Sequence, residues 1–333
     1  MSPGKDSPRA GEFELIERYF APLAAGAAGT FGLHNDAAVL PLAPGERLVT
    51  TVDTMIQGRH FLDCPPDLVA RKLLRVNLSD LAAMGAVPFG YLLASAWPFD
   101  IEEAWIAGFS AGLAEDQAAF GVTLFGGDTT GTPGPMTLSL TAFGRIAGER
   151  VLDRASLRPG EDLYVTGSLG DGWLGLEALR GKLAALPETQ RGELVGRYRL
   201  PQPRVALGQA LLKEGLARSA IDVSDGLAAD LGHLLEASGV AAEVEVAALP
   251  VGPAAEAALA ALGLPRQAVA AGGDDYELLF AADPAAREAV AALARRLGVA
   301  ITRIGRVADG GGLTLRDAAG REVALDAPGW RHF

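Results

Sequence analysis

The chain has 333 residues, 49% of them apolar, which is enough for about two domains with buried cores. Its net charge of −12, without a long basic run, excludes sequence-independent binding to nucleic acid, because such binding needs Lys and Arg on the phosphates. The single Cys64 excludes an internal disulfide and fits a reducing cytoplasm, and the first residues lack the apolar stretch of a signal peptide.

The first half of the chain predicts a unit of mixed helices and strands. Residues 1–11, rich in Pro, Gly and Ser, predict a mobile head. Apolar residues at helical spacing predict helices, and apolar runs bounded by Gly and Pro predict strands. In chain order these are a helix at 12–23, strands at 36–42 and 47–55 joined by a Pro-Gly turn at 44–45, a helix at 65–86, a strand at 88–97, a helix at 101–121, and strands at 121–128 and 136–146.

The second half predicts more strands with Ala- and Leu-rich helices between them. The strands are expected at 162–167, 220–226, 241–247, 276–282, 300–307, 312–317 and 321–325. The two halves together predict an α/β (α+β) protein, with an N-terminal domain at 12–148 and a C-terminal domain at 149–333.

Several local patterns match a known motif only in part. The uncharged span 81–99 is long enough to cross a membrane, but its Gly and Pro residues predict a helix end, a turn and a strand. The run GDGWLG at 170–175 lacks the acidic residue that a dinucleotide-binding strand carries further on, so we expect a strand-turn-helix corner. The run LRGKL at 179–183 is no Walker A loop, and no two histidines have the short spacing of a zinc pair.

The stretch FGGDTTGTPGP at 125–135 allows two interpretations. Gly, Asp and Pro together are typical of a turn that ends a strand. Alternatively, Asp128 and its neighbouring hydroxyls meet a charged ligand, with Gly126 and Gly127 allowing close approach of the backbone.

Acids elsewhere in the chain favour the second interpretation. Six aspartates follow apolar runs or lie among small residues: Asp36, Asp53, Asp80, Asp128, Asp222 and Asp225. Each alone is typical of a cap or turn, but a buried isolated carboxylate is costly and tends to be paired or bound to metal. No comparable cluster of Lys or Arg accompanies them, so they favour several hard cations with oxygen ligands, which suits magnesium. Magnesium held by carboxylates and substrate phosphates is typical of phosphoryl transfer, and an acidic protein needs such ions to bind a polyanion like ATP.

The chain resembles the thiamine-monophosphate kinase family, within the superfamily of aminoimidazole ribonucleotide synthetase and selenophosphate synthetase. The resemblance is carried, in order, by GEFELIERYF, VDTMIQGRHF, NLSDLAAMGAVP, FGGDTTG, YVTGSLGDG, AIDVSDGLAADLGH, GGDDYELLF and GWRHF. It implies transfer of the γ-phosphoryl of ATP to thiamine monophosphate, with magnesium, and a homodimer built through the N-terminal domains.

The resemblance also implies roles for individual residues. The magnesium ligands would be Asp36, Asp53, Asp80, Asp128 and Asp222, with Asp225 a further ligand and Thr51 a further candidate. The ATP contacts would be Gly127, Asp128, Arg154 and Ser224, and the contacts to the thiamine end would be His60, Asp274 and Trp330. An indole can stack on a cationic heterocycle, and a carboxylate can pair with its charge.

The chain departs from the family pattern at three places. His34-Asn35-Asp36 stands where the family usually has Gly-Asp-Asp, so we expect one metal to be held more weakly. Val52 lacks the hydroxyl that is common at its position, and Asp274 is one methylene shorter than the usual Glu.

The acceptor implied by the resemblance needs no general base, because a phosphate monoester with a second pKa near 6 is already mostly ionised at pH 7. We therefore expect direct in-line transfer without a phosphoenzyme, aided by several metal ions. Two alternatives stay open: a sibling ATP-dependent ribonucleotide cyclising synthetase, and a catalytically inactive nucleotide-binding regulator, which the departure at His34-Asn35 makes conceivable.

Overall fold

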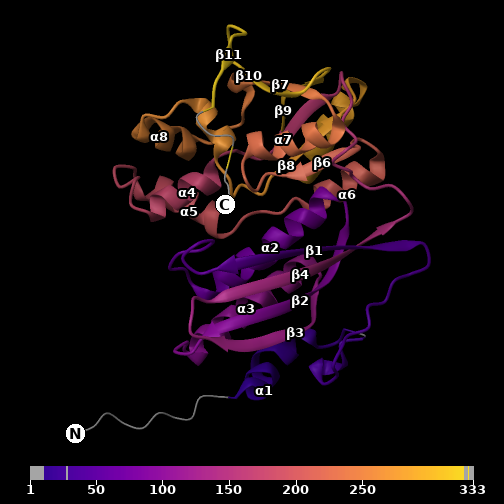
Figure 1. Ribbon diagram of the computed structural model, residues 1–333, viewed down its shortest axis with the longest axis vertical. Helices are drawn as coiled ribbons and strands as arrows, with labels where there is room; N and C mark the ends of the chain where they lie inside the picture. The colour runs from indigo at the N-terminus through magenta and orange to yellow at the C-terminus, as the bar shows by residue number, and fades with distance from the viewer. Residues whose placement is uncertain (1–10, 28, 326–328, 330–333) are drawn as a thin grey trace. The chain divides into compact units, whose positions relative to one another are not determined.

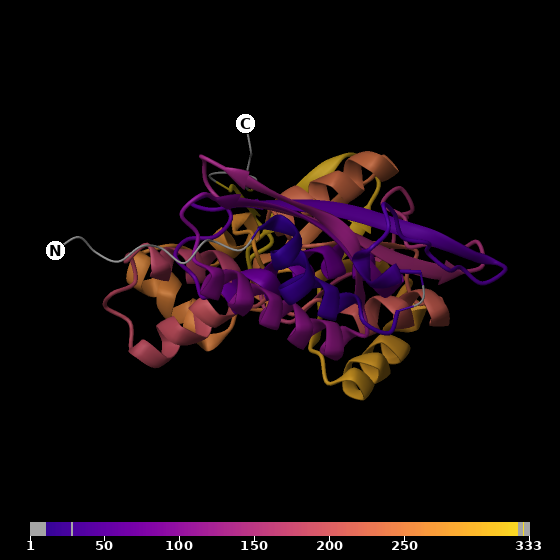
Figure 2. The same ribbon diagram turned by 90° about the horizontal axis from the view of Figure 1, so that it is seen from below.

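The computed structural model describes residues 11–27, 29–325 and 329 (Figures 1 and 2). These residues divide into two compact units. The first unit comprises the described residues of Met1–Asn77 with Pro88–Arg145, and the second those of Leu78–Val87 with Ile146–Phe333. The domain limits predicted from the sequence, 12–148 and 149–333, differ in the segment Leu78–Val87 and stay a prediction. Apart from Gly11, the predicted mobile head lies outside the described residues.

The first unit is built on a four-stranded sheet in the order β1-β4-β2-β3 (Figure 1). Its strands are β1 (Glu46–Ile56), β2 (Val87–Pro98), β3 (Thr123–Thr132) and β4 (Thr137–Ala147). Its helices and helical turns are α1 (Glu12–Leu15), η1 (Ile16–Phe20), η2 (Ala21–Ala24), η3 (Phe31–Leu33), α2 (Pro66–Ala83), whose last turns belong to the second unit, and α3 (Glu103–Phe120).

Helices α2 and α3 pack on each other and on one face of this sheet. The ring of Trp97 on β2 lies 5.4 Å from that of Phe109 on α3. Gly112 of α3 lies so close to Asp67 of α2 that a Cβ there would meet the Asp67 carbonyl oxygen at 2.4 Å. Between the helices, the fully buried Asp116 accepts hydrogen bonds from Arg75 at 2.6 and 2.9 Å.

The second unit holds a seven-stranded mixed sheet in the order β11-β10-β7-β9-β5-β8-β6. Its strands are β5 (Asp162–Thr166), β6 (Ser219–Asp222), β7 (Ala241–Glu245), β8 (Leu278–Ala282), β9 (Ile301–Ala308), β10 (Gly312–Arg316) and β11 (Glu322–Val323). Its helices are α4 (Asp171–Leu179), α5 (Glu188–Arg199), α6 (Val205–Glu214), α7 (Leu227–Ser238), α8 (Pro253–Leu262) and α9 (Arg287–Leu297), with shorter turns η4 (Val246–Ala248), η5 (Arg266–Ala271) and η6 (Pro284–Ala286).

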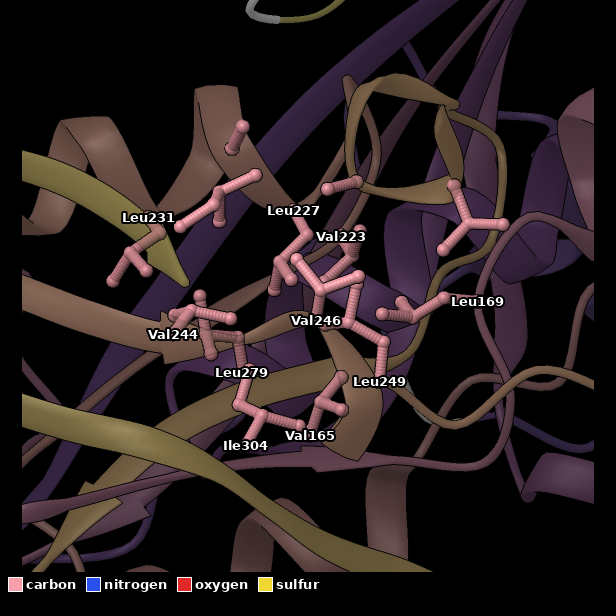
Figure 3. Packing of buried hydrophobic residues seen from close by; sticks show 14 of the residues in the cluster. Val165, Leu169, Val223, Leu227, Leu231, Val244, Val246, Leu249, Leu279 and Ile304 are labelled. Atoms are coloured by element: carbon pink, nitrogen blue, oxygen red, sulfur yellow. The ribbon is translucent and has the colours of Figure 1, made fainter. Parts of the chain in front are cut away.

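The central strands of this sheet are buried on both faces. Val165 and Leu279 point into the cluster drawn in Figure 3, which α4, α7 and α8 complete. Their neighbours Tyr164 and Phe280 join the opposite cluster with α6 and α9, and their rings stack at 5.3 Å. Because successive strand residues face opposite sides, near-continuous apolar runs are what a doubly covered sheet requires. The ends of β6 and β8 are thereby fixed, and the candidate site of this unit lies there.

The predicted α/β (α+β) class is confirmed, and so are most of the expected strands and helices. The strand expected at 220–226 ends at Asp222, where a turn begins. The expected strand at 36–42 is wrong: Val39 and Leu42 are 62% and 40% exposed, and Pro41 removes a donor that a ladder would need. The turn interpretation of the stretch 125–135 is wrong up to Thr132, since β3 continues to that residue as the edge strand of its sheet. The span 81–99 is a helix end followed by β2, and no helix among the described residues is long and apolar enough to cross a membrane.

Candidate active site

A pocket of about 570 Å³ in the first unit brings three of the predicted site residues together. Asp36, Gly127 and Asp128 all line it, although Asp36 is far from the other two in sequence. Most of the remaining lining is apolar and aromatic, with a few hydroxyls: Phe20, Leu33, Leu40, Leu92, Leu124, Phe125 and Phe143 accompany Thr129, Ser139 and Thr141. Its size is within the range of small-molecule sites, which combine apolar walls with few polar groups.

A β-bulge places Asp128 in this pocket. Strand β3 runs parallel to β2, with Tyr91 opposite Leu124 but Leu92 opposite Gly126, so Phe125 is an extra residue. Since side chains alternate along a strand, the extra residue changes the face on which every later side chain lies. Leu124 is opposite the fully buried Tyr91, whereas Asp128 is opposite Ala94, and both Ala94 and Asp128 are exposed.

Gly127 is required by the neighbouring strand. A Cβ at this position would meet the carbonyl oxygen of Leu93 at 1.8 Å, so any other residue would push β3 away from β2. From the sequence, we expect Gly127 to let the backbone approach a ligand closely. The structure shows that the same property serves the pairing of the two strands.

Asp36 lies in an irregular segment fixed by hydrogen bonds of its own. The Thr30 hydroxyl donates to the carbonyls of Ala24 and Ala27 at 3.1 and 3.0 Å, and the Val39 N–H donates to Gly29 at 2.9 Å. Asn35 also lines the pocket, so an amide stands where the family pattern has an acid. Within the described part of the chain, no ion pair involves Asp36 or Asp128, which leaves two exposed carboxylates beside one cavity.

Thr51, Asp53 and His60 belong to β1 and the turn after it, and they do not line the pocket. The Asp53 N–H donates to Oδ1 of Asn77 at 3.2 Å, and Asn77 is a fully buried residue of α2. The Ile56 N–H donates to Nδ1 of His60 at 3.0 Å. A neutral His60 that accepts at Nδ1 carries its proton on Nε2.

In the second unit, Asp222 ends β6 and is 3% exposed. Its Oδ2 accepts a hydrogen bond from the hydroxyl of Ser79 at 2.7 Å. Ser79 is followed on α2 by Asp80, so this contact brings the predicted ligands Asp80 and Asp222 into one region of the unit.

The residues after Asp222 form a tight turn around a buried carboxylate that the sequence analysis did not single out. Oδ2 of Asp230 accepts the N–H groups of Ser224, Asp225 and Gly226 at 3.0, 3.1 and 3.1 Å. Burial, and then the charge of Asp225, raise the pKa of Asp230 to about 7. The predicted ligands Ser224 and Asp225 are therefore held in place by their own N–H groups, which donate to Asp230. The acidic side chains of Asp225 and Asp230 lie close together.

The segment with Asp274 pairs with this turn. The Asp274 N–H donates to the Ser224 carbonyl at 2.8 Å, and the Tyr276 N–H donates to Val223 at 2.8 Å. Asp274 and Tyr276 have positive φ values of 66° and 52°, a conformation that side chains other than Gly rarely adopt. The predicted substrate contact Asp274 thus lies beside the predicted ATP contact Ser224.

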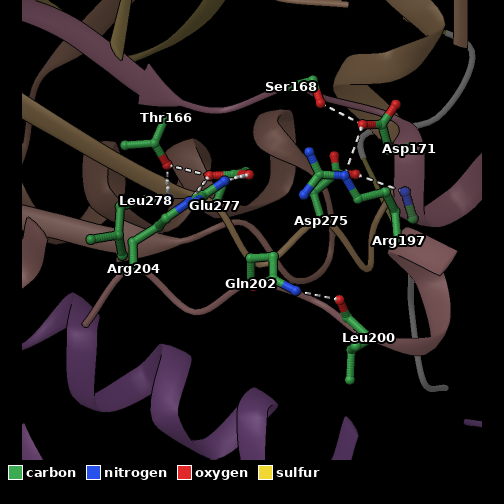
Figure 4. Close-up of polar contacts among 11 residues, drawn as sticks. Thr166, Ser168, Asp171, Arg197, Leu200, Gln202, Arg204, Asp275, Glu277 and Leu278 are labelled. Carbon is green, nitrogen blue, oxygen red and sulfur yellow. Dashed lines mark hydrogen bonds and ion pairs between the residues drawn. The ribbon is translucent and has the colours of Figure 1, made fainter. Parts of the chain in front are cut away.

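Two further buried acids support the Asp274 segment (Figure 4). Asp275, 9% exposed, accepts the N–H groups of Gly170 and Gly172 at 2.7 and 3.0 Å, which fixes the corner before α4. Glu277 accepts from the hydroxyl of Thr166 at 2.5 Å and from Nε of Arg204 at 2.6 Å. The predicted strand-turn-helix corner at GDGWLG is confirmed, and its first turn is held by a carboxylate.

The structure does not bring Arg154 to this region. The Arg154 side chain is exposed, and the Arg154 carbonyl accepts a hydrogen bond from the hydroxyl of Ser238 at 3.1 Å. Trp330 lies outside the described residues.

Sequence reasoning missed the supporting residues Asn77, Ser79, Asp230, Asp275 and Glu277. The sequence signals for these residues are weak. Asp230 is an acid in the first turn of a helix, which is a common position, and Asp275 directly follows an acid that already had a role.

The carboxylates of the predicted site residues fit magnesium in groups of two. Among the described residues, no three or more His, Cys, Asp or Glu side chains are close enough to hold a metal ion alone. Asp36 and Asp128 share a pocket, and Asp222 and Asp225 flank one turn. One or two carboxylates, completed by phosphate oxygens and water, is the coordination that magnesium prefers in nucleotide sites.

The comparisons with known proteins cover both halves of the chain. A family model described as AIR synthase related protein, N-terminal domain, matches residues 34–146, and one described as AIR synthase related protein, C-terminal domain, matches 158–318. Thiamine-monophosphate kinase of Caulobacter vibrioides is 44% identical over 328 residues, which are 96% of this chain and 90% of the relative. The chain belongs to the thiamine-monophosphate kinase family.

Solved structures of this kinase family share the fold. The crystal structure of thiamine-monophosphate kinase from Stenotrophomonas maltophilia K279a has a TM-score of 0.81 at 38% identity, covering 94% of this chain and 98% of its own. The structure of AaThiL complexed with AMPPCP and TMP has a TM-score of 0.76 at 28% identity and covers 100% of both chains. The resemblance predicted from the motifs is confirmed.

We predict that Asp275→Asn changes how stability depends on pH. Burial raises the pKa of Asp275 well above its ordinary value of 3.8, so the folded protein keeps a proton that the unfolded chain releases. Wild-type stability should therefore fall with rising pH relative to the variant, which has no such proton. Urea unfolding at about pH 5, 6, 7 and 8 measures the difference. A difference that stays constant over this range would contradict the prediction.

The control is Asp162→Asn, whose stability difference from the wild type should stay constant over this range, because the Asp162 carboxylate is ionised in both the folded and the unfolded chain. A hydrogen bond from Arg287 lowers the pKa of Asp162 below its ordinary 3.8. Its contribution to stability is present above that value and is lost as the pH falls through the lowered pKa.

Proposed function

We propose that this chain transfers the γ-phosphoryl group of ATP to thiamine monophosphate, giving thiamine diphosphate and ADP. The observation that carries the proposal is similarity to thiamine-monophosphate kinases over almost the whole chain, together with a pocket that Asp36, Gly127 and Asp128 line. The structure of AaThiL complexed with AMPPCP and TMP supports the same two substrates here. A reaction that consumes ATP also supports the cytoplasmic location expected from the sequence.

The pocket of the first unit offers an apolar wall and an acidic end. We assign the wall, with Phe20, Leu92 and Phe125, to the base of ATP, and the end with Asp36 and Asp128 to its phosphates through metal. The pocket of about 570 Å³ has room for such a ligand.

Magnesium, when bound, would neutralise phosphate charge and hold the transferred group in line. Its ligands would be Asp36, Asp53, Asp80, Asp128, Asp222 and Asp225, with Thr51 as a further candidate. Gly127, Arg154 and Ser224 would contact ATP, and His60, Asp274 and Trp330 the thiamine end. An ionised acceptor phosphate needs no general base, so these side chains bind, orient and neutralise rather than move a proton.

The first test measures ADP release from magnesium-ATP with thiamine monophosphate, with thiamine and with no acceptor. We expect release that requires the monophosphate and forms thiamine diphosphate, because thiamine lacks the ionised acceptor phosphate. Release with a ribonucleotide substrate instead would indicate a sibling synthetase. ATP binding without turnover of any acceptor would indicate the regulator.

Asp128→Asn should lower turnover by about 100-fold and raise the magnesium concentration needed for half-maximal activity, because an amide oxygen is a weaker ligand than a carboxylate. Asp53→Asn should act in the same direction. Asp128 is exposed, so thermal unfolding of its variant should match the wild type. The matched control is Asp100→Asn, an exposed acid outside the pocket, which should keep full activity. Near-normal turnover in both the Asp53 and Asp128 variants would overturn the metal assignment.

We also propose a homodimer built through the sheet of the first unit. Val52 and Leu48 on β1 are 59% and 42% exposed and share a face by strand alternation. Met55, on the opposite parity of the same strand, is 3% exposed, so Val52 and Leu48 lie on the face of β1 away from Met55. Exposed apolar side chains on a sheet face are typical of an interface.

Val52→Asp should therefore convert a dimer into a 34.4 kDa monomer, because the new charge would be buried at the interface. Light scattering after size exclusion measures the mass. Leu264→Asp is the control, since Leu264 is 37% exposed but lies in the second unit. A monomeric wild type, or a dimeric Val52→Asp variant, would contradict the proposed interface.

A further inference from the structure

We propose that Asp230 is a positioning residue for phosphoryl transfer. Its buried carboxylate holds the turn Ser224–Gly226 and, through that turn, the Asp274 segment in the arrangement that binds both substrates. The inference rests on the proposed function, because it assigns Asp222, Ser224 and Asp225 to magnesium-ATP and Asp274 to the acceptor. Asp230 itself has no proposed contact with either substrate.

The turn depends on Asp230 for its shape. One oxygen, Oδ2, accepts three successive N–H groups, those of Ser224, Asp225 and Gly226, at 3.0 to 3.1 Å. Three consecutive donors can converge on one atom only when the backbone curls around it, in the manner of an anion-binding nest. Asp230 is 3% exposed, whereas Ser224 and Asp225 are half-buried and remain available to a ligand.

The space around the turn leaves it few alternatives. Gly226 has φ 117°, and a Cβ there would meet the Ala271 carbonyl carbon at 2.9 Å. A Cβ on Gly273 would meet the Ser224 carbonyl oxygen at 2.4 Å. The two segments are therefore packed backbone to backbone, and a turn released from Asp230 cannot relax without displacing its neighbour.

The second segment takes its position from the first. Ser224 accepts the Asp274 N–H and Val223 accepts the Tyr276 N–H, each at 2.8 Å, and the Val223 N–H donates to the Glu277 carbonyl at 2.8 Å. These bonds form a short ladder between the metal-side residues and Asp274. Loss of the Asp230 carboxylate should therefore disturb the binding of both substrates, although the carboxylate belongs to neither site.

This double effect separates a positioning role from a purely structural one. We expect Asp230→Ala to raise the KM for magnesium-ATP and the KM for thiamine monophosphate together, each about tenfold, and to lower kcat. Asp230→Asn keeps an oxygen that can accept N–H groups, so it should recover a large part of the loss. Ser224→Ala should affect magnesium-ATP alone, and Asp274→Ala should affect the acceptor alone.

Asp162→Asn is the stability control. Asp162 is 2% exposed and accepts from Arg287 at 2.6 and 2.9 Å, on β5 of the same sheet. It should lower the unfolding midpoint and leave both KM values unchanged. If Asp230→Ala behaves in the same way, with a lower unfolding midpoint and unchanged KM values, the positioning role is wrong.

A readout independent of turnover keeps this inference separate from the proposed reaction. Hydrogen exchange of the whole protein should show faster exchange at residues 224–226 and 274–276 in Asp230→Ala, and near-normal exchange in Asp230→Asn. Unchanged exchange at both segments would overturn the inference even if the kinase activity is found. Absence of thiamine-monophosphate-dependent ADP release in the wild type would overturn the reaction instead, and the exchange data would still decide whether Asp230 organises the two segments.

Discussion

Backbone N–H groups, rather than basic side chains, hold two of the buried acids around the candidate site of the second unit, Asp230 and Asp275. Asp230 accepts three of them and Asp275 two. Elsewhere the same chain satisfies buried acids with arginine, as at Asp116 and Asp162. An arginine beside the turn of Ser224 would neutralise the carboxylate charge that attracts a magnesium ion. Holding these acids with neutral donors fixes the loops without placing a positive charge beside them.

The candidate acids of the first unit are stabilised in a different way. Asp36 and Asp128 are exposed and come from an irregular segment and an edge strand, so solvent, rather than a donor array, stabilises them. Their common position beside an apolar pocket is what makes them a site. Membership of the thiamine-monophosphate kinase family gives this arrangement its substrates under the proposed function.

Most of the fold could be predicted because the strands of the second unit are buried on both faces and read as unbroken apolar runs, such as LLFAA in β8. The exceptions have local causes. The run at 36–42 is apolar and β-branched in part, but its Val39 is solvent-exposed and its N–H donates to Gly29 in a turn, which no periodicity reveals. The stretch after Phe125 has the composition of a turn, yet β2 supplies a partner strand, so tertiary pairing overrides local preference.

The candidate ligands could be proposed from sequence because acids are unusual among Ala, Val and Gly. The residues that orient them could not, because Asp230 and Asp275 act on backbone groups. A backbone donor leaves no residue type in the sequence to pair with an acid, so only coordinates reveal such contacts.

The single extra residue at Phe125 makes β3 a strand with two registers joined end to end. Up to Leu124 its alternation is set by the core, and from Gly126 it is set by the pocket. Without the bulge, the alternation that begins before Leu124 would continue, and the Asp128 side chain would lie on the same face as Leu124. Grafting this segment onto a regular sheet would therefore need the bulge as well as the motif. The spacing between Leu124 and Asp128 is as much a part of the site as the carboxylate itself.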